Sequence, residues 1–227
     1  MELPRLAVVI PTLNAADRLA PCLSALAATA LGPEVLVVDG GSTDDTVTVA
    51  ASHGIAVVAS PPGRGRQLGA GVDASDADWL LFLHADTVLE AGWDRALAAF
   101  ITDPARQNDA ATFVFALDDP APAARRLERI VGWRTRALAM PYGDQGLAIS
   151  RRVYRRLGGF RPLPIMEDVD FIRRIPVGRL HVLPVRAVTS ARRYRQGGYV
   201  ARPLRNLFCQ ALWRAGLPAD LVARLYR

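Results

Sequence analysis

The sequence predicts an α/β protein with a mostly parallel central sheet. Short apolar runs typical of strands alternate with longer segments in which apolar residues recur every three or four positions, as in amphipathic helices. Carboxylates follow two of the strand-like runs, Asp39 after residues 35–38 and Asp86 after residues 79–85. Open α/β sheets bind ligands outside the carboxyl ends of their strands. The fold class therefore points to these two residues as candidate site residues.

The first half of the chain repeats a strand followed by a helix. Residues 6–10 form the first strand-like run, and Asn14 is placed to cap a helix over residues 15–30. The second strand leads through two glycines and a Ser-Thr pair into another helix. The remaining predictions here are helices near 44–53, 66–74 and 91–101 and strands at 55–59 and 79–83. Strands joined by helices in this way pair in parallel.

The second half of the chain is less regular. Residues 111–117 alternate like a strand, and residues 121–139 predict a basic amphipathic helix. Further predictions are a short strand at 146–150, a helix over 167–175, a strand over 180–188 interrupted by Pro184, and tail helices over 203–213 and 219–226. No internal repeat or low-complexity linker divides the chain, so we expect a single domain over residues 1–227.

The composition favours a cytoplasmic protein. The 227 residues are 51% hydrophobic, carry a formal charge of +6, and include 28 basic residues that are all arginines. Arginine suits phosphate binding, but the abundance of Ala, Arg and Gly is better explained by genome composition. Cys22 and Cys209 are in no metal or redox spacing, which indicates a reduced compartment. No apolar run reaches the roughly 20 residues of a membrane span, and the scattered arginines disfavour a nucleic-acid partner.

Four motifs follow one another in the order and spacing of a known enzyme family. They are Val8–Asn14, Val37–Thr46, Leu83–Asp86 and Met166–Asp170. Together they resemble the GT-A type glycosyltransferases of family 2, over residues 6–190. Residues 65–67, 141–146 and 190–193 look most like the bacterial branch named radical-SAM/selenodomain-associated transferase 2.

The resemblance implies a fold and a reaction. The fold is the GT-A fold of nucleotide-diphospho-sugar transferases, a Rossmann-like sheet flanked by helices, with a helical C-terminal tail. Residues 1–110 would be the nucleotide-binding half, 111–190 the acceptor and catalytic half, and 191–227 the tail. The reaction is a metal-dependent, inverting transfer of a sugar from a nucleotide-diphosphate sugar to an acceptor that the sequence does not identify.

The resemblance places the donor, expected to be a UDP-sugar, at the strand ends of the first half. The implied residues are Pro11, Asn14, Asp39, Arg66, Ala85 and Asp86. A carboxylate such as Asp39 accepts hydrogen bonds from a base, and the glycines after it let a nucleotide approach the backbone. Gly40 stands where the family usually has a second Asp. From the residues alone, this segment is equally a capped strand-to-helix turn, and Arg64 is better explained as part of a solvated loop.

A divalent metal, Mn²⁺ or Mg²⁺, is implied at the end of the fourth strand. Asp86 matches the second carboxylate of the family's Asp-X-Asp signature, and His84 replaces the first. An imidazole ligates Mn²⁺ but weakens the expectation of tight Mg²⁺ binding. The alternative is that His84 merely packs at a strand end.

Glu167, Asp168 and Asp170 gather three carboxylates at a predicted helix start. An inverting transfer needs one base to take the proton of the acceptor hydroxyl. By resemblance the base is Asp168. An acidic helix start is otherwise an ordinary arrangement favoured by the helix dipole.

The segment before the 146–150 strand predicts a polar loop at a cleft. Tyr142, Asp144 and Gln145, together with Glu167, are the candidates for acceptor or sugar binding. A turn without a ligand is the alternative. Trp133 could stack on a sugar, but an aromatic residue on an amphipathic helix is more often part of the core.

The tail mixes arginines with large apolar side chains over residues 192–227. Such a segment is typical of peripheral contact with an anionic membrane, here the inner membrane. It is equally consistent with a helix that covers the sheet or with a homodimer contact.

Two other functions stay open. GT-A-like folds also catalyse nucleotidyl transfer, although residues 11–15 are not the glycine-rich phosphate loop on which those enzymes depend. A non-catalytic nucleotide-binding module would account for the missing acidic residues at positions 40 and 84.

Overall fold

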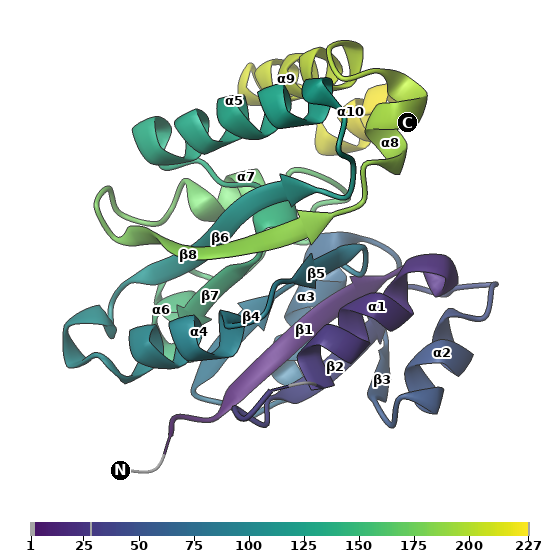
Figure 1. Cartoon of the computed structure of the whole chain (residues 1–227). Coiled ribbons are helices and arrows are strands. Elements are labelled where there is room, and N and C mark those ends of the chain that lie inside the picture. Colours follow the sequence, from purple (N-terminus) through teal and green to yellow (C-terminus); the bar gives the residue numbers. More distant parts are fainter. Residues whose placement is uncertain (1–2, 28, 227) are drawn as a thin grey trace.

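The computed structural model describes residues 3–27 and 29–226, whose strands form one mixed sheet (Figure 1). The strand order is β3-β2-β1-β4-β7-β6-β8-β5. The strands are β1 (Leu6–Thr12), β2 (Glu34–Asp39), β3 (Ala56–Ala59), β4 (Trp79–Phe82), β5 (Thr87–Leu89), β6 (Ala110–Leu117), β7 (Leu147–Ser150) and β8 (Leu180–Thr189). Pairing is parallel from β3 to β4 and antiparallel on both sides of β7.

Helical crossovers make the first four strands parallel. Helix α1 (Ala16–Ala27) joins β1 to β2, α2 (Thr46–Ser52) joins β2 to β3, and α3 (Arg64–Asp73) joins β3 to β4. The carboxyl ends of these strands therefore meet at one edge of the sheet, where Thr12 pairs with Asp39. This edge is where the sequence analysis expects the site.

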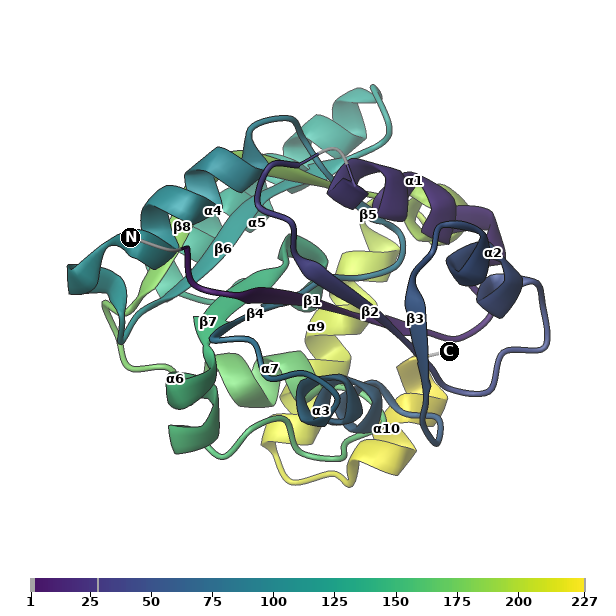
Figure 2. The same ribbon diagram turned by 90° about the horizontal axis from the view of Figure 1, so that it is seen from below.

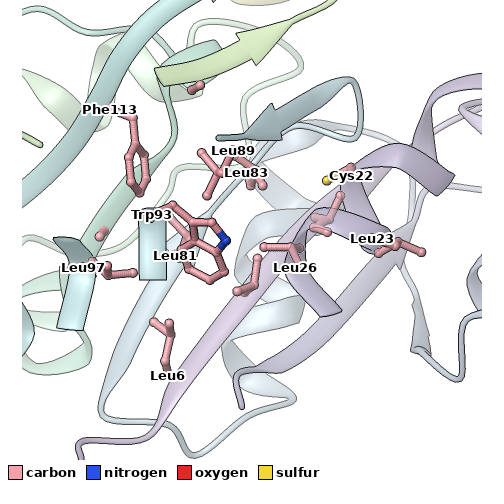
Figure 3. Close-up of a cluster of buried hydrophobic side chains, with 14 of the residues drawn as sticks. Leu6, Cys22, Leu23, Leu26, Leu81, Leu83, Leu89, Trp93, Leu97 and Phe113 are labelled. Atoms are coloured by element: carbon pink, nitrogen blue, oxygen red, sulfur yellow. The ribbon is translucent and has the colours of Figure 1, made fainter. Parts of the chain in front are cut away.

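Side-chain alternation along β1 builds an apolar layer on each face of the sheet. Leu6, Val8 and Ile10 pack with α1 and α4 (Trp93–Thr102), and Figure 3 shows this cluster. Ala7 and Val9 pack on the other face with α3, α6 (Arg151–Arg156) and α7 (Glu167–Ile172). Figure 2 shows the two groups of helices on opposite sides of the sheet. Both layers hold the strand ends in fixed positions.

A bulge in β8 shapes the second half of the sheet. Leu183 pairs with Phe113 but Arg186 pairs with Val114, so Pro184 and Val185 loop out. Proline has no N–H to donate to the ladder, and a bulge accommodates that loss. Beyond the bulge, β8 pairs with β5 up to Thr189.

The remaining helices gather at one end of the molecule, at the top of Figure 1. They are α5 (Pro122–Leu138), α8 (Arg192–Gly197), α9 (Ala201–Arg214) and α10 (Ala219–Tyr226). Two short 3-10 turns, η1 (Pro104–Arg106) and η2 (Gly143–Gln145), flank β6 and β7. In the part of the chain that the structure describes, no helix is both long and apolar enough to cross a membrane.

The predicted order of strands and helices is confirmed, together with the mostly parallel first half. The sequence analysis missed β5, α6 and α8, which are too short to show a periodicity. The predicted cap by Asn14 is wrong. The N–H of Ala16 donates to Asp44 Oδ2 at 3.1 Å, whereas Asn14 Oδ1 accepts from the N–H of Thr43 at 2.9 Å. Asn14 therefore ties β1 to the loop after β2 rather than starting α1.

Candidate active site

A pocket of about 260 Å³ lies between the carboxyl edge of the sheet and the helices that gather above it. We call its two walls the sheet side and the helical side. The sheet side contributes Arg64, His84, Asp86, Tyr142, Gly143, Asp144 and Asp168. The helical side, from α5, α8, α9 and α10, contributes Arg134, Arg193, Arg202, Asn206, Gln210 and Tyr226, with apolar residues between them. Five predicted site residues thus line the pocket: His84, Asp86, Tyr142, Asp144 and Asp168.

His84 and Asp86 lie in the turn between β4 and β5. The N–H of Thr87 donates to the carbonyl of His84 at 3.1 Å and closes the turn. The N–H of Ser190 donates to the carbonyl of Asp86 at 3.0 Å, which ties the turn to the chain after β8. The backbone bonds hold the turn in place, and both side chains line the pocket.

Gly143 brings His84 and Asp168 together. Its N–H donates to Asp168 Oδ2 at 2.8 Å, and the N–H of Val169 donates to Oδ1 at 2.8 Å. A Cβ at position 143 would lie 2.6 Å from His84 Nε2 and 3.3 Å from Asp168 Oδ2. Real Cβ atoms do not approach a ring nitrogen so closely, so glycine is what permits this arrangement. The predicted metal turn and the predicted base therefore meet at one residue.

Of the two arginines at the start of α3, the structure places in the pocket the one that the sequence did not favour. Arg66 is exposed and lies outside the pocket lining, whereas Arg64 lines the pocket and its Nε lies 2.9 Å from Glu167 Oε1. Glu167 is 1% exposed, and burial raises its pKa to about 7 although Arg64 opposes the rise. Glu167 pairs with Arg64 and lies outside the lining of this pocket, but it lines a neighbouring cavity together with His84 and Asp168. Its predicted contact with a sugar or acceptor stays a prediction.

The loop before β7 divides its predicted ligands between the pocket and the core. Asp144 lines the pocket, its buried Oδ1 has no hydrogen-bond partner among the described residues, and burial raises its pKa to about 6. Gln145 is 1% exposed, its Nε2 donates to the carbonyl of Phe113 at 3.0 Å, and its Oε1 accepts from the hydroxyl of Thr135 at 3.0 Å. Gln145 therefore fastens η2 to β6 and α5, and its predicted contact with a sugar or acceptor stays a prediction.

The end of β2 holds Asp39 in a tight hydrogen-bond network. Its Oδ2 accepts from the N–H groups of Gly41 at 3.0 Å and Ser42 at 2.8 Å. Its Oδ1 accepts from the hydroxyls of Ser42 at 2.5 Å and Thr12 at 3.1 Å. Burial opposes ionisation, but these four bonds hold the pKa of Asp39 below its usual range. Asp39 thus shapes its turn, and its predicted contact with a nucleotide stays a prediction.

The other predicted donor residues lie outside the pocket lining. Pro11 is buried within β1, and Asn14 is exposed at the end of that strand. Their donor roles, like that of Arg66, stay predictions. The side chain of Ala85 packs into the apolar cluster between the sheet, α1 and α4, and its donor role also stays a prediction.

The side chains of the β4–β5 turn fit a metal ion that is bound together with its substrate. Burial and Arg64 lower the pKa of His84 to about 4, so its imidazole is neutral and able to ligate. Asp86 adds a hard carboxylate oxygen. Within residues 3–27 and 29–226, no group of three or more His, Cys, Asp or Glu side chains could hold a metal alone. Mg²⁺ and Mn²⁺ commonly take their other ligands from water and substrate phosphates. This pair suits an ion shared with a diphosphate.

The helical side is what the sequence analysis missed. Its residues come from α5 and from the tail, far along the chain from the Asp86 motif. The signals in the sequence are the basic amphipathic pattern over 121–139, the motif at 190–193, and the mixture of arginine and apolar residues in the tail, and none of them indicates a wall of the pocket. Trp133 is 64% exposed on α5, so its interpretation as a core residue is wrong.

Comparisons with known sequences agree with the motifs. The family model described as glycosyl transferase family 2 matches residues 7–158. The uncharacterized glycosyltransferase Rv0539 of Mycobacterium tuberculosis is 45% identical over 86 residues, which are 37% of this chain and 38% of that protein. The PGL/p-HBAD biosynthesis glycosyltransferase Rv2957 of the same organism is 38% identical over 110 residues, 44% of this chain and 43% of that protein. The matches thus span less than half the length of these relatives.

Solved structures share the fold at low sequence identity. Residues 1–349 of TarS from S. aureus superpose with a TM-score of 0.65 at 16% identity, covering 98% of this chain and 69% of that chain. The mannosyltransferase PcManGT of Pyrobaculum calidifontis, in complex with GDP-Man and Mn²⁺, gives 0.64 at 19% identity, covering 93% and 63%. The M. tuberculosis glucosyl-3-phosphoglycerate synthase, in complex with Mn²⁺, UDP and glucosyl-3-phosphoglycerate, gives 0.63 at 20% identity, covering 95% and 81%. With a family model that matches more than half of its length, this GT-A chain belongs to glycosyltransferase family 2.

Proposed function

We propose that this protein transfers a sugar from a nucleotide-diphosphate sugar, a UDP-sugar in the first instance, to an acceptor hydroxyl. One observation carries the proposal. His84 and Asp86 from the β4–β5 turn and Asp168 from α7 line the same pocket, and Gly143 lies between His84 and Asp168. A metal-binding pair and a carboxylate base in one pocket are what a metal-assisted single displacement requires.

Asp168 is the proposed base. Two backbone N–H groups hold its carboxylate at 2.8 Å each, and these bonds leave further lone pairs for an acceptor hydroxyl. As the acceptor oxygen attacks the anomeric carbon, Asp168 takes the hydroxyl proton. The bond from that carbon to the diphosphate oxygen breaks, and its electron pair leaves with the nucleoside diphosphate. Attack opposite the leaving group inverts the anomeric carbon.

Arg64, His84 and Asp86 are the proposed diphosphate residues. A divalent ion bound by Asp86 and His84 would neutralise the charge that grows on the leaving diphosphate. Arg64 adds a fixed positive charge to the same side of the pocket, and the buried Glu167 holds its guanidinium in place. Pro11, Asn14, Asp39 and Arg66 are proposed for the nucleoside, at the ends of β1 and β2 and the start of α3.

Three finer assignments accompany this proposal. The motif residues at 65–67, 141–146 and 190–193 support the radical-SAM/selenodomain-associated branch. A single domain in the cytoplasm is proposed from the unbroken composition and the two thiols. Peripheral contact with an anionic membrane is proposed for the outer face of α9, where Leu204 and Phe208 are more than half exposed beside arginines.

The test is calorimetric titration of the protein with UDP, GDP and dTDP, each with and without Mn²⁺. We expect one nucleotide to bind in a metal-dependent way. Asp86→Ala should abolish this binding, and His84→Ala should weaken it about tenfold by removing one ligand. Asp73→Ala, which removes an exposed carboxylate at the end of α3, is the matched control and should bind like the original protein.

The same titration separates the roles of metal and protein. Because the turn supplies only two ligands, Mn²⁺ alone should bind weakly, and binding should tighten when the nucleotide is present. If the folded protein binds none of the three nucleotides, the transferase proposal is wrong. If Asp86→Ala binds the nucleotide as tightly as the original protein, the proposed metal site is wrong, but the proposed nucleotide-sugar donor is not.

A further inference from the structure

The helical side of the pocket is positively charged. Its charged residues are Arg134 of α5, Arg193 of α8 and Arg202 of α9. The carboxylates that line the pocket, Asp86, Asp144 and Asp168, all belong to the sheet side. A ligand between the two walls therefore meets three carboxylates and Arg64 on the sheet side, and only positively charged groups among the charged residues of the helical side.

The three arginines lack carboxylate partners. Across the described ranges, none of them forms an ion pair, whereas their neighbour Arg192 pairs with Asp17 at 2.8 Å. Asp144 attracts Arg134 without a hydrogen bond or ion pair to it. Arg134 and Arg202 are half-buried and Arg193 is exposed, so the first two are partly withdrawn from water without a carboxylate to offset their charge. These arginines have charge left for a ligand.

Arg134 and Arg202 are also held in position before any ligand arrives. The guanidinium of Arg134 lies 3.5 Å from the centroid of the Tyr142 ring, and its Nε donates to the carbonyl of Met140 at 2.9 Å. The guanidinium of Arg202 lies 4.9 Å from the centroid of the Tyr226 ring. Stacking uses the flat faces of the guanidinium and leaves N–H edges for an anion. Groups ordered in advance lose less conformational entropy on binding.

Asn206 adds an unsatisfied polar atom to the same wall. It lies one helical turn after Arg202, so both face the same side of α9. Its buried Oδ1 has no hydrogen-bond partner within the described residues. A buried polar atom without a partner costs roughly 1–3 kcal/mol. A polar ligand in the pocket would recover part of that cost.

We propose that the acceptor carries an anionic group, a phosphate or a carboxylate, which Arg134 and Arg202 bind on the helical side. This inference rests on the proposed function and names the class of its second substrate. The anion is bound at the wall opposite Asp168, and the acceptor hydroxyl then faces the base. The donor diphosphate lies on the sheet side with Arg64, so the pocket has two separate anion sites. A volume of about 260 Å³ suits a small acceptor or the end of a larger one.

The test titrates simple anions into the protein saturated with UDP and Mn²⁺, so that the donor site is filled. Inorganic phosphate and malonate are titrated in parallel and represent the two chemistries. We expect at least one to bind, and Arg134→Gln and Arg202→Gln each to weaken that binding about tenfold, as the loss of one charge-assisted contact does. Arg205→Gln is the matched control, because Arg205 is exposed on α9 outside the pocket lining.

Two readouts keep the inference separate from the proposed function. UDP should bind all three variants like the original protein, since none of these arginines belongs to the sheet side. Arg202→Lys should recover part of the anion affinity because it restores the charge without the planar fork. If UDP binds but neither anion does, or if both pocket variants bind anions like Arg205→Gln, the inference is overturned. If UDP does not bind at all, the proposed function fails first.

Discussion

Two polar regions of this molecule are built in opposite ways. At the ends of β1 and β2, Asp39 accepts four hydrogen bonds from its own surroundings, and Gln67 donates to the carbonyls of Thr12 at 2.7 Å and Val38 at 2.9 Å. In the pocket, the buried Oδ1 atoms of Asp144 and Asn206 have no partner in the part of the chain described. The pKa shifts of two aspartates therefore have opposite signs, since the pKa of Asp39 is lowered and that of Asp144 is raised.

In the β1–β2 region, folding alone supplies the hydrogen-bond partners of the buried polar groups. In the pocket, some of those partners are left for a ligand to supply. Folded proteins pair nearly all buried polar groups, so unpaired ones that line a pocket are positions where a substrate or ion can supply the partner. The β1–β2 region can then act as a rigid platform, whereas the pocket carries a stability cost that ligand binding offsets. The predictions below test this contrast, from the largest expected effect to the smallest.

Asp168→Asn should have the largest effect, because it removes the proposed proton acceptor from the pocket. Sugar transfer, or slow hydrolysis of the donor with water as acceptor, should fall roughly 10³-fold, within the range for loss of a general base. Calorimetry should give unchanged UDP affinity, since the shape of the side chain is kept. Undiminished activity in this variant would favour nucleotidyl transfer, and a protein that binds UDP but never turns over would favour a non-catalytic module.

Gln67→Leu should destabilise the β1–β2 region. The change removes two buried hydrogen bonds to strand-end carbonyls, at a cost of about 2 kcal/mol in the free energy of unfolding, although the carbonyl of Thr12 still accepts from the N–H of Gly40 at 2.9 Å. Urea denaturation measures this. Asn206→Leu is the counterpart in the pocket and should cost little or nothing, because it removes an oxygen that has no partner. Equal losses in the two variants would contradict the contrast between the regions.

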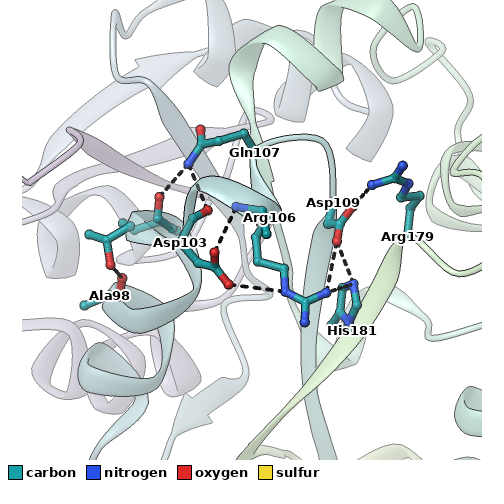
Figure 4. Close-up of polar contacts among 10 residues, drawn as sticks. Ala98, Asp103, Arg106, Gln107, Asp109, Arg179 and His181 are labelled. Atoms are coloured by element: carbon teal, nitrogen blue, oxygen red, sulfur yellow. Dashed lines mark hydrogen bonds and ion pairs between the residues drawn. The ribbon is translucent and has the colours of Figure 1, made fainter.

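Asp109 offers a second completed network, at the start of β6 (Figure 4). Its carboxylate accepts from His181 at 2.8 Å, Arg179 at 2.9 Å and Arg106 at 3.3 Å. Burial opposes the charge, but these bonds hold the pKa of Asp109 below its usual range. The folded state therefore releases this proton more readily than the unfolded state, so the stabilisation is complete above the ordinary pKa and is lost as the pH falls below it.

Asp109→Asn should accordingly lower the free energy of unfolding by about 1–3 kcal/mol at neutral pH, where the carboxylate is charged and paired. The difference from the original protein should shrink as the pH falls through the acid range. Urea denaturation at several pH values measures both. A difference that stays constant with pH would show that the charge of Asp109 contributes nothing.

Asp144→Asn should raise the free energy of unfolding, whereas Asp109→Asn should lower it. Burial raises the pKa of Asp144 to about 6, so at neutral pH the folded protein holds a charge that the unfolded chain hydrates better. A raised carboxyl pKa makes stability fall as the pH rises from the ordinary value toward the folded one. The Asn variant should be more stable by about 1 kcal/mol at neutral pH, in thermal unfolding, while sugar transfer weakens. A loss of stability would mean that the charge has a partner.

The smallest effect concerns the outer face of α9. Leu204→Ser combined with Phe208→Ser should leave stability within about 0.5 kcal/mol, because both side chains are more than half exposed. Sedimentation with vesicles that contain anionic lipid should fall in this variant. Vesicle binding that is unchanged, together with a dimer that dissociates in gel filtration, would replace the membrane contact with a homodimer contact.

The fold could be predicted from the sequence because its signals are local. Apolar runs, helix periodicity and strand-end carboxylates each depend on a few neighbouring residues, and they located β1 to β4 and Asp86, whereas Asp168 was identified by the resemblance to the family. The same locality explains the misses. Asp144 and Gln145 are adjacent in one loop, yet one faces the pocket and the other the core.

Side-chain direction and tertiary contact account for the remaining errors. The choice between Arg64 and Arg66 depends on how α3 sits, and a Cβ on Gly65 between them would lie 2.0 Å from the carbonyl oxygen of Arg161. That close approach sets which arginine faces the pocket, and no local pattern encodes it. Arg134 and Arg202 meet only because α5 and α9 pack at the same end of the molecule.

A deletion in the bulge at Pro184 and Val185 would displace the pocket residues that follow it. Ser190, whose N–H anchors the Asp86 turn, and Arg193 of α8 both come after the bulge, beyond the end of β8. Deleting one residue there would turn every later side chain of the strand to the opposite face. Deleting both would preserve the faces but draw the following segment back by roughly 7 Å, at about 3.3 Å a residue. The number of residues between the bulge and Arg193 therefore sets where the helical side lies relative to the proposed metal-binding turn.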